Sequence, residues 1–514
     1  MGTLHSGFFS DVALANTSDI QALINAGSYS NDYIVELPPG DIVINRLFFF
    51  YHPTINPGFN PNSRAGFFTL RGKGQLDISS GIQNNYNKGT VLRSIYSGQG
   101  GAVVIASAEH GHDIGPYPSR KFVLEDITLV ANNTGYVLEA DGCPEIRLTR
   151  STMIQKHVDG SGLLIRSAWQ GVVDQCTIRQ VGGNNCTGVG ISLGTNIQAG
   201  AFEIIGGTTV GNFNVNIKWV GQTRFSNMWL NNIIVTHSYR AGLEIEGRLL
   251  SLVISGHFEK NPQDILVTGE VNNLNINNLY LLGGNPNEVS SLSRIDLVGG
   301  VSSCNISHIY CFRPSSNLIR LASIAGVGCS AEIAHINYET DSISSLKKTI
   351  TAITEHQSGE IVLEDVGHGL EIGRRIAMKS SDVTGEWPVA VVDANTLRLV
   401  GSTYAGPYNT LGEYILLCHV VECLDTTVVP QMTDITFSGG AADLLTTSAY
   451  RLIDTTIQKR YNYTSHKTPV MTYGSAIPNW TGALGDIQYD TNPTTSIGWV
   501  YSGGTWKVFG AITQ

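Results

Sequence analysis

One short phrase recurs nine times between Leu124 and Tyr338, and its copies begin 22 to 32 residues apart. Each copy has an apolar residue, two small or turn-type residues, a mostly apolar residue, an outward position and usually another apolar residue. A repeat of this length indicates a stacked array, because one unit cannot bury its apolar face alone. The unit is strand-like and lacks a helical stripe, which predicts one coil of a parallel β-helix. The copies begin at Leu124, Leu148, Val173, Ile205, Leu230, Ile254, Ile276, Ile306 and Ile333.

The composition agrees with a stacked coil and narrows the possible partners. Only 14% of the 514 residues are charged and 57 are Gly, as expected where most residues lie in strands or tight turns. The net charge of −10 is spread along the chain, whereas a nucleic-acid surface requires a basic stripe. No apolar stretch reaches 18 residues, so no membrane span is expected.

Neither cysteines nor histidines indicate a metal site or a disulfide framework. The eight Cys show no C-x-x-C spacing, and Cys176 and Cys311 fall in strand positions of the repeat, which favours buried thiols. His110 and His112 lie beside Asp113, but the spacing supplies no third ligand. We therefore expect a loop there, with no metal and no cofactor.

The first hundred residues contain a recognisable series of motifs. Residues 19–26 read DIQALINA with helical spacing, and VELPPG at 35–40, LRGKG at 70–74 and GTVL at 89–92 follow. This series resembles the opening of pectate-lyase-like right-handed β-helix proteins. The resemblance implies that the short amphipathic helix plugs the open end of the coil, whose exposed edge would otherwise pair with another chain.

Two segments near the C-terminus resemble modules of phage tail proteins. They are residues 349–417, with phrases at 367–373 and 392–396, and residues 485–507. Together with the coil they resemble phage tailspikes, which are homotrimers on the virion tail that bind and cut bacterial capsule or O-antigen polysaccharide. The expected organisation is an N-terminal cap with the first coils over 1–100, a β-helix with a substrate groove over 101–345, a small β module over 346–420 and a C-terminal β region for trimerisation or carbohydrate contact over 421–514.

Glu244 and Glu246 are the first candidates for catalysis. Alternation in the strand phrase 243–247 places Leu243 and Ile245 inside and both carboxylates outside, with Cα atoms about 6.5–7 Å apart. Paired carboxylates perform glycosidic hydrolysis, in which retaining enzymes hold them about 5–5.5 Å apart and inverting ones about 6.5–9.5 Å. Flexible Glu side chains satisfy either requirement. The alternative is two solvated side chains on an outer face.

Glu259 is the third catalytic candidate. Aligning the nine copies places it in a column whose other members are apolar or aromatic. A carboxylate among them is either misaligned, placed where the strand turns outward, or buried and paired. Burial would raise its pKa, as a general acid needs. His257 and Lys260 lie beside it in sequence and are candidates for substrate binding. The alternative is a structural carboxylate satisfied by turn amides.

The neighbouring, outward column of the same alignment places Phe258, Tyr280 and Tyr310 on consecutive coils. Stacked at about 4.8 Å, such rings would form a ladder suited to the faces of sugars. The alternative is a ladder beneath a loop or at a subunit interface. We list these three rings as substrate-binding candidates.

The sequence therefore predicts an all-β fold, a right-handed parallel β-helix with small C-terminal β modules. The expected function is a trimeric tailspike depolymerase that hydrolyses bacterial surface polysaccharide as an endo-glycosidase. A lyase that uses a His, Tyr or Lys base, with Lys218, Arg166 or Arg240 neutralising a uronate, is the second possibility. A receptor-binding spike without catalysis is the third.

Overall fold

The computed structural model describes most of the chain up to residue 408 and shorter segments after it. The described residues are 2–3, 13–27, 32–50, 52, 54–58, 67–74, 89–106, 121–166, 168–183, 185–194, 200–222, 226–283, 293–312, 318–325, 327–339, 347–365, 375–379, 383–408, 413–416, 421–423, 428–438, 459–460, 471–474, 487–490, 496–502 and 505–511. The chain divides into two compact units, Met1–Gly284 with Arg294–Cys304 and Ile324–Gly326, and the remainder. No helix in the described part is long and apolar enough to cross a membrane.

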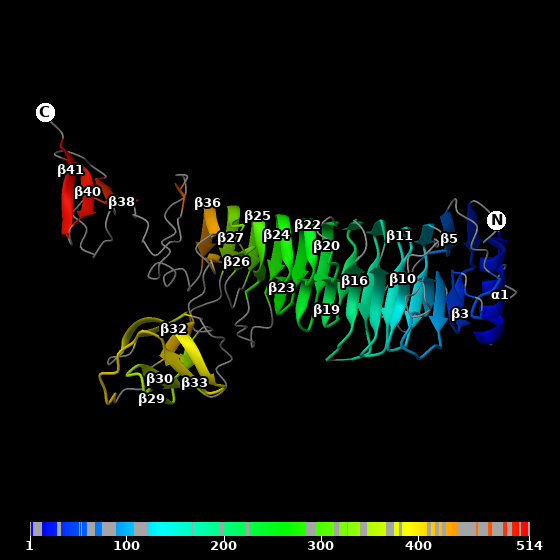
Figure 1. Ribbon diagram of the computed structural model, residues 1–514, viewed down its shortest axis with the longest axis horizontal. Coiled ribbons are helices and arrows are strands. Elements are labelled where there is room, and N and C mark those ends of the chain that lie inside the picture. Colours follow the sequence, from blue (N-terminus) through cyan, green and yellow to red (C-terminus); the bar gives the residue numbers. More distant parts are fainter. Residues whose placement is uncertain are drawn as a thin grey trace. The chain divides into compact units, whose positions relative to one another are not determined.

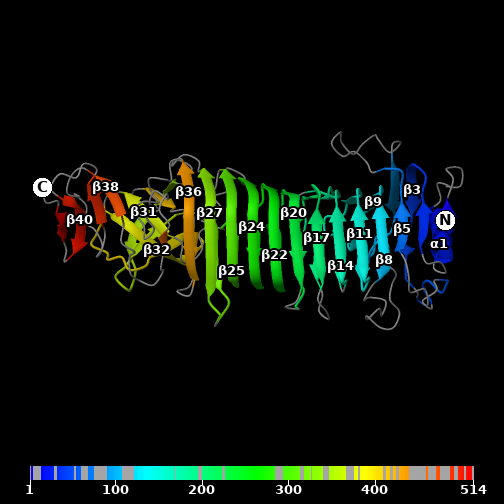
Figure 2. The ribbon, with the colours of Figure 1, turned by 90° about the horizontal axis from the view of Figure 1, so that it is seen from above.

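The first unit is a parallel β-solenoid with three sheets, in which successive strands of a sheet belong to successive coils (Figures 1 and 2). The first sheet contains β1 (Gly2–Thr3), β2 (Tyr33–Glu36), β5 (Phe67–Arg71), β8 (Lys121–Glu125), β11 (Glu145–Thr149), β14 (Gln170–Asp174), β17 (Ala201–Ile205) and the first parts of β20 (Asn227–Thr236), β22 (Arg248–Glu259) and β24 (Glu270–Leu282).

The second and third sheets continue each coil. The second sheet contains β3 (Gly40–Ile44), β6 (Thr90–Ser94), β9 (Thr128–Ala131), β12 (Thr152–Gln155), β15 (Thr177–Gln180), β18 (Thr209–Gly211) and the last parts of β20, β22 and β24. The third sheet contains β4 (Leu47–Phe48), β7 (Val103–Ala106), β10 (Tyr136–Asp141), β13 (Ser161–Arg166), β16 (Val189–Gly194), β19 (Val215–Trp219), β21 (Ala241–Ile245), β23 (Gln263–Val267) and the start of β25 (Ile295–Phe312).

The repeated phrase marks the corner where each coil turns from the first sheet to the second. Its third residue has a positive φ in every copy, a conformation that Gly, Asn, Asp and His tolerate best. This geometry explains the two turn-type residues of the phrase. The third residues are Asp126, Arg150, Gln175, Gly207, Asn232, Gly256, Asn278, His308 and His335.

The core of the solenoid consists of inward columns that stack one residue per coil. In the third sheet, parallel register aligns a column of aliphatic side chains, each at most 1% exposed, so that every coil covers the apolar residue of the coil before it. The column contains Leu138, Leu163, Ile191, Ile217, Leu243 and Ile265.

Helix α1 (Ala13–Gly27) covers the N-terminal end of the solenoid, beside β3 (Figure 1). Its residue Ile20 is fully buried, and its polar side chains form hydrogen bonds with backbone groups of the first coil. Asn16 Nδ2 donates to the Val43 carbonyl at 2.9 Å, and Gln21 both accepts from the amide of Phe48 and donates to its carbonyl. The helix therefore satisfies the open strand edge that the sequence resemblance implied it would cover.

The second unit contains parallel coils of its own, beyond the point where the sequence alignment ends. β26 (Ile319–Ser323) pairs in parallel with β35 (Val421–Cys423), and β27 (Cys329–Glu339) pairs in parallel with β36 (Val428–Ser438). The register aligns Ile333 with Met432 and Ile336 with Ile435, so residues 432–435 are a tenth copy of the phrase. The prediction that the repeat stops after Tyr338 was wrong, because the chain inserts another structure between two coils.

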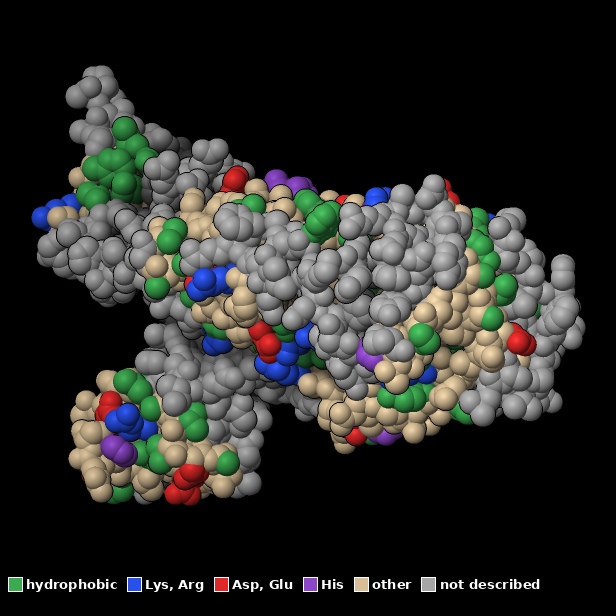
Figure 3. Space-filling view, turned by 45° about the vertical axis from the view of Figure 1, so that its right-hand side comes forward, with side chains coloured by type: hydrophobic (Ala, Val, Ile, Leu, Met, Phe, Trp, Pro, Cys, Tyr) green, Lys and Arg blue, Asp and Glu red, His purple; other side chains and the backbone are tan. Residues whose placement is uncertain are grey.

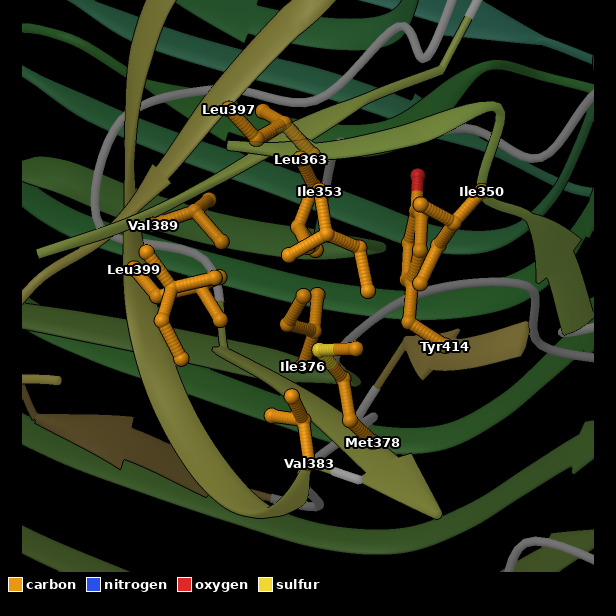
Figure 4. Close-up of a cluster of buried hydrophobic side chains, with 11 residues drawn as sticks. Ile350, Ile353, Leu363, Ile376, Met378, Val383, Val389, Leu397, Leu399 and Tyr414 are labelled. Carbon is orange, nitrogen blue, oxygen red and sulfur yellow. The ribbon is translucent and has the colours of Figure 1, made fainter. Parts of the chain in front are cut away.

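That inserted structure is an antiparallel sheet with the strand order β28-β34-β31-β32-β33-β30-β29. Its own apolar core includes Ile376, Leu363 and Leu397 (Figure 4). Tyr414 closes one side, where its hydroxyl donates to Asp365 at 2.6 Å. The strands are β28 (Lys347–Thr349), β29 (Ala352–Glu355), β30 (Ile361–Glu364), β31 (Arg375–Lys379), β32 (Thr384–Asp393), β33 (Thr396–Leu399) and β34 (Glu413–Leu416).

A four-stranded sheet lies near the C-terminus, and β37 (Lys459–Arg460) pairs with β36. Its strands are β38 (Met471–Gly474), β39 (Ile487–Asp490), β40 (Ser496–Ser502) and β41 (Thr505–Ala511). The phrase at 367–373 lies outside the described residues. The predicted all-β fold, a parallel β-helix followed by small β modules, is confirmed.

Candidate functional site

The outward face of the third sheet holds the first carboxylate pair. Glu244 lies in β21, between the core residues Leu243 and Ile245, and therefore faces outward as predicted. Its side chain is nevertheless fully buried, so the alternative of a solvated side chain does not hold for Glu244. Alternation fixes the face on which a side chain lies, but it does not report what covers that face.

Lysine 218 bridges the two carboxylates. Lys218, in register with Glu244 on the preceding coil, places Nζ 3.5 Å from Oε2 of Glu244 and 2.7 Å from Oε1 of Glu246. Arg240 adds an ion pair to Oε1 of Glu244. Glu246 follows the end of β21 and keeps 40% of its side chain exposed. The structure thus brings a buried and an accessible carboxylate together around one ammonium group.

Burial separates the acidities of the two carboxylates. It raises the pKa of Glu244, and the nearby Lys218 and Arg240 oppose this rise without cancelling it. Glu246 raises the pKa of Glu244 further, because two negative charges at short range disfavour each other. A carboxyl group with a raised pKa beside an accessible carboxylate is an arrangement suited to acid-assisted cleavage of a glycosidic bond.

Further polar side chains follow the same outward column. Glu244 is in register with Leu266, which is in register with Asp296, so Asp296 lies in the column of Glu244 two coils later. Asp296 is buried and accepts a hydrogen bond from Gln263 Nε2 at 3.2 Å. The face shown in Figure 3 carries acidic and basic side chains next to each other in small groups, not as a patch of one sign.

Glu259 does not occupy the inward column to which the alignment assigns it. Val235 is in register with Phe258, and Phe258 with Leu281, so Phe258 is the fully buried core residue and Glu259 is half-exposed on the outer face. The misalignment that the sequence left open for Glu259 is therefore the case, and the prediction of an outward Phe258 was wrong. The corner of this coil is one residue shorter than its neighbours, which shifts the alignment after Ile254 by one position.

Gly256 makes the short corner possible. It takes the place in register that Ile233 occupies on the preceding coil, with φ at 138°. A Cβ at this position would lie 2.2 Å from the Ile233 carbonyl oxygen. Only glycine combines this backbone conformation with so close an approach.

The remaining binding candidates in this unit gather around Glu259 on the second sheet. His257 Nε2 lies 3.7 Å and Lys260 Nζ 3.4 Å from the Glu259 carboxylate. The His257 and Tyr280 rings meet edge to face at 5.2 Å, and Tyr280 is 39% exposed. This group is a titratable and aromatic surface on a different sheet from Glu244 and Glu246, so the three predicted catalytic carboxylates are divided between two sheets.

Three other sequence predictions concern residues outside these groups. Tyr310 lies half-buried in β25, within the second unit. His110, His112 and Asp113 lie outside the described residues. Arg166, named with Lys218 and Arg240 as a cation for a lyase, has its guanidinium 3.7 Å from Asp141.

Thiol chemistry has little support in the described part of the chain. The six Cys whose side chains the structure describes are buried, and burial raises the pKa of Cys143 and Cys176 to about 12. A thiol of such low acidity is inert as a nucleophile. No group of three or more His, Cys, Asp or Glu side chains is arranged to hold a metal ion among the residues that the structure describes.

Lys218 is the residue of this site whose role was missed from the sequence. The sequence indicates Lys218 only as a cation for a uronate, although coil-by-coil alignment of the third sheet places it beside Glu244. The missed signal is the second strand phrase of each coil, whose register runs without a shift from Leu163 to Ile265.

The comparisons with known proteins add little to this picture. No protein-family model matches the chain, and no curated protein matches it. Among solved structures, ORF18 of Geobacillus virus E2 is similar over 96% of this chain and 83% of its own, with 10% sequence identity and a TM-score of 0.29. A TM-score this low does not establish a shared fold.

Proposed function

We propose that the chain binds a polysaccharide and hydrolyses its glycosidic bonds at Glu244 and Glu246. The observation that carries the proposal is the pair of carboxylates around Lys218, one buried with a raised pKa and the other accessible. Glu244 would act as the general acid and Glu246 as the nucleophile or base. The β-solenoid is compatible with this role but does not by itself specify it.

The spacing of the pair favours a retaining mechanism. The two oxygens that face Lys218 Nζ are at most about 6.2 Å apart, which is below the about 6.5–9.5 Å between the carboxyl groups of inverting enzymes. Glu244 would protonate the glycosidic oxygen while Glu246 attacks the anomeric carbon and forms a glycosyl ester. Water would then attack that carbon and pass a proton to Glu244, releasing Glu246.

Substrate access requires a movement of Arg240. Glu244 has no exposed surface, whereas the Arg240 side chain that pairs with it is about half exposed. An entering sugar would displace this guanidinium from Glu244, which would also remove one of the two cations that favour the ionised carboxylate. The proton of the general acid would thereby be held more strongly when substrate is bound.

The sequence resemblance supplies the substrate class and the setting. We propose a phage tailspike depolymerase, a homotrimer on the virion tail that acts on bacterial capsule or O-antigen. The His257, Lys260 and Tyr280 group on the second sheet is proposed to contact the polymer at a distance from the cleavage point, through an exposed ring and a cation.

The lyase alternative is less favoured by the geometry. Lys218 and Arg240, which would have to neutralise a uronate, are already paired with Glu244 and Glu246. A binding spike without catalysis remains the alternative from another class, because exposed rings and polar side chains suffice for recognition.

Incubation with a panel of capsular and O-antigen polysaccharides tests the proposal. We expect shorter chains with new reducing ends, and nuclear magnetic resonance of the first product should show the anomeric configuration of the substrate. Products with the ultraviolet absorbance of an unsaturated uronate would instead identify a lyase. If the chain binds a polymer of the panel but shortens none of them, it is a receptor-binding spike.

Light scattering tests the proposed assembly separately. The native mass at micromolar protein should be that of three chains. A mass of one chain under these conditions would contradict the trimer without affecting the assignment of the carboxylates.

A further inference from the structure

Trp169 is the aromatic side chain with the greatest exposure among the large hydrophobic residues of the described chain, at 62%. It follows β13 at the corner that leads from the third sheet back to the first. Its backbone is fixed, because its amide donates to the Pro144 carbonyl at 3.0 Å and its carbonyl accepts from the amide of Ala201 at 2.9 Å. An indole held open to solvent on a rigid corner costs hydrophobic free energy, which suggests that a ligand covers it.

The corner of Trp169 lies on the same side of the solenoid as the carboxylate pair. Arg166, the last residue of β13, is in register with Gly194, and the register of β16, β19 and β21 continues this column through Val220 to Glu246. Three steps between parallel strands correspond to about 14 Å. The two residues between Arg166 and Glu246 in this column are Gly194 and Val220, and neither has a long side chain.

Arg166 supplies a cation at the same corner, three residues before Trp169 in the chain. Its Nη2 lies 3.7 Å from Asp141 Oδ2, beyond hydrogen-bond distance, and its Nε is buried without a hydrogen-bond partner. The side chain is 41% exposed. A buried donor without a partner is costly, and a ligand oxygen would satisfy it.

We propose that Trp169 and Arg166 form a subsite for an acidic sugar unit of the polysaccharide. The sugar ring lies against the indole, and its carboxylate accepts hydrogen bonds from the guanidinium. This inference rests on the proposed function for the position of the cleaved bond, about three coils away, and it adds that the polymer is acidic. The subsite binds substrate at a distance and takes no part in the chemical step.

The experiment measures binding and cleavage separately. Two ligands are compared by their binding affinity: a polymer that the wild-type chain binds, and the same polymer with its carboxyl groups reduced to alcohols. Each is titrated against the wild type, Glu246→Gln, Trp169→Ala, Trp169→Phe and Arg166→Met. Ile95→Ala is the control, because Ile95 is an exposed apolar residue elsewhere on the solenoid, at 58%. Melting curves confirm that each variant folds.

Trp169→Ala should bind the acidic polymer about tenfold more weakly, whereas Trp169→Phe should remain within about threefold of the wild type, since a ring is retained. Arg166→Met should bind the acidic and the reduced polymer equally, whereas the wild type should prefer the acidic one. For cleavage, Trp169→Ala should raise KM and leave kcat unchanged.

Unchanged affinity of Trp169→Ala for a polymer that the chain binds would overturn the subsite, even if cleavage at Glu244 and Glu246 is established. Equal wild-type affinity for the acidic and reduced polymers would overturn the acidic-sugar assignment. Binding that depends on Trp169 in a chain that cleaves nothing would instead contradict the proposed function and retain the subsite.

Discussion

The early and late coils of the solenoid place their charged side chains differently. Before residue 180, the charged residues of the described chain keep some exposed surface, from 6–8% at Glu139, Asp141 and Glu145 to the ion pair between Arg150 and Asp126, whose side chains are 46% and 31% exposed. Between residues 215 and 297, four charged residues are at most 2% exposed, namely Glu244, Asp296 and the ion pair of Asp264 with Arg294. Buried charge is costly, so its concentration in one stretch marks where the chain gives up stability.

Glu145 and Glu244 show the difference most clearly, because each faces two cations. Lys121 and Arg147 lie 2.9 Å and 2.7 Å from Glu145 and lower its pKa although burial opposes them. At Glu244 burial outweighs its two cations and raises the pKa. The same kind of ion pairing therefore gives opposite acidities, and only the raised pKa suits a general acid.

Removing a cation should distinguish the two regions most strongly. In Arg294→Met, the fully buried Asp264 loses its ion pair and keeps only the hydrogen bond from Asn261, so the free energy of unfolding should fall by about 3–5 kcal/mol. Arg150→Met breaks an exposed pair and should cost about 1 kcal/mol or less. Urea unfolding measures both.

Adding Asp264→Asn to Arg294→Met provides the control. The double variant should recover part of the lost stability, because it no longer contains an unpaired buried charge. Equal losses in Arg294→Met and Arg150→Met would show that burial does not separate the late coils from the early ones.

Two glycines with similar backbone conformations allow the short corner of the late region to be compared with an open corner of the early region. Gly256 and Gly183 have φ values of 138° and 132°, but only Gly256 has neighbours close to an added Cβ. Gly183→Ala should cost about 1–3 kcal/mol from backbone strain alone. Gly256→Ala should lower the melting temperature further, and a smaller loss than in Gly183→Ala would contradict the described corner.

The pH dependence of stability should have opposite signs for Glu244 and Glu145, and this effect should be smaller than those of the preceding substitutions. The stability contributed by Glu244, with a raised folded pKa, is present below the ordinary value of 4.5 and is lost as the pH rises through the folded pKa. The contribution of Glu145, with a lowered folded pKa, is present above 4.5 and is lost as the pH falls through its folded pKa.

Urea unfolding between about pH 3.5 and 7 measures this contrast. The stability difference between wild type and Glu145→Gln should increase with pH. The difference between wild type and Glu244→Gln should decrease over the same change. Parallel curves for the two variants would contradict the opposite pKa shifts.

The repeated phrase predicted the solenoid because it encodes two local requirements, a buried strand and a corner with positive φ. Asn278 and His308 satisfy the corner, and Ile276 and Leu279 satisfy the core. The alignment failed at Gly256, where one missing residue exchanges the two faces of the following strand and moves Glu259 outward.

The rest depends on contacts between distant segments. The burial of Glu244 and its pairing with Lys218 arise between coils, as does the return of the solenoid at Met432 after the inserted sheet. Trp169 occurs outside any repeated phrase, so nothing in its local sequence distinguishes it from a core residue. Periodicity predicts which face a side chain takes, and only the assembled coils show which faces are covered.

The most direct test of the account is the rate of reducing-end release by Glu244→Gln, Glu246→Gln and Glu145→Gln on a polysaccharide that the wild type shortens. Losing the acid or its partner should reduce the rate by about 10²–10⁴-fold. Glu145→Gln removes an equally paired carboxylate from the first sheet and should retain the wild-type rate. Full activity in both Glu244→Gln and Glu246→Gln, or an equal loss in Glu145→Gln, would contradict the assignment of catalysis to the pair around Lys218.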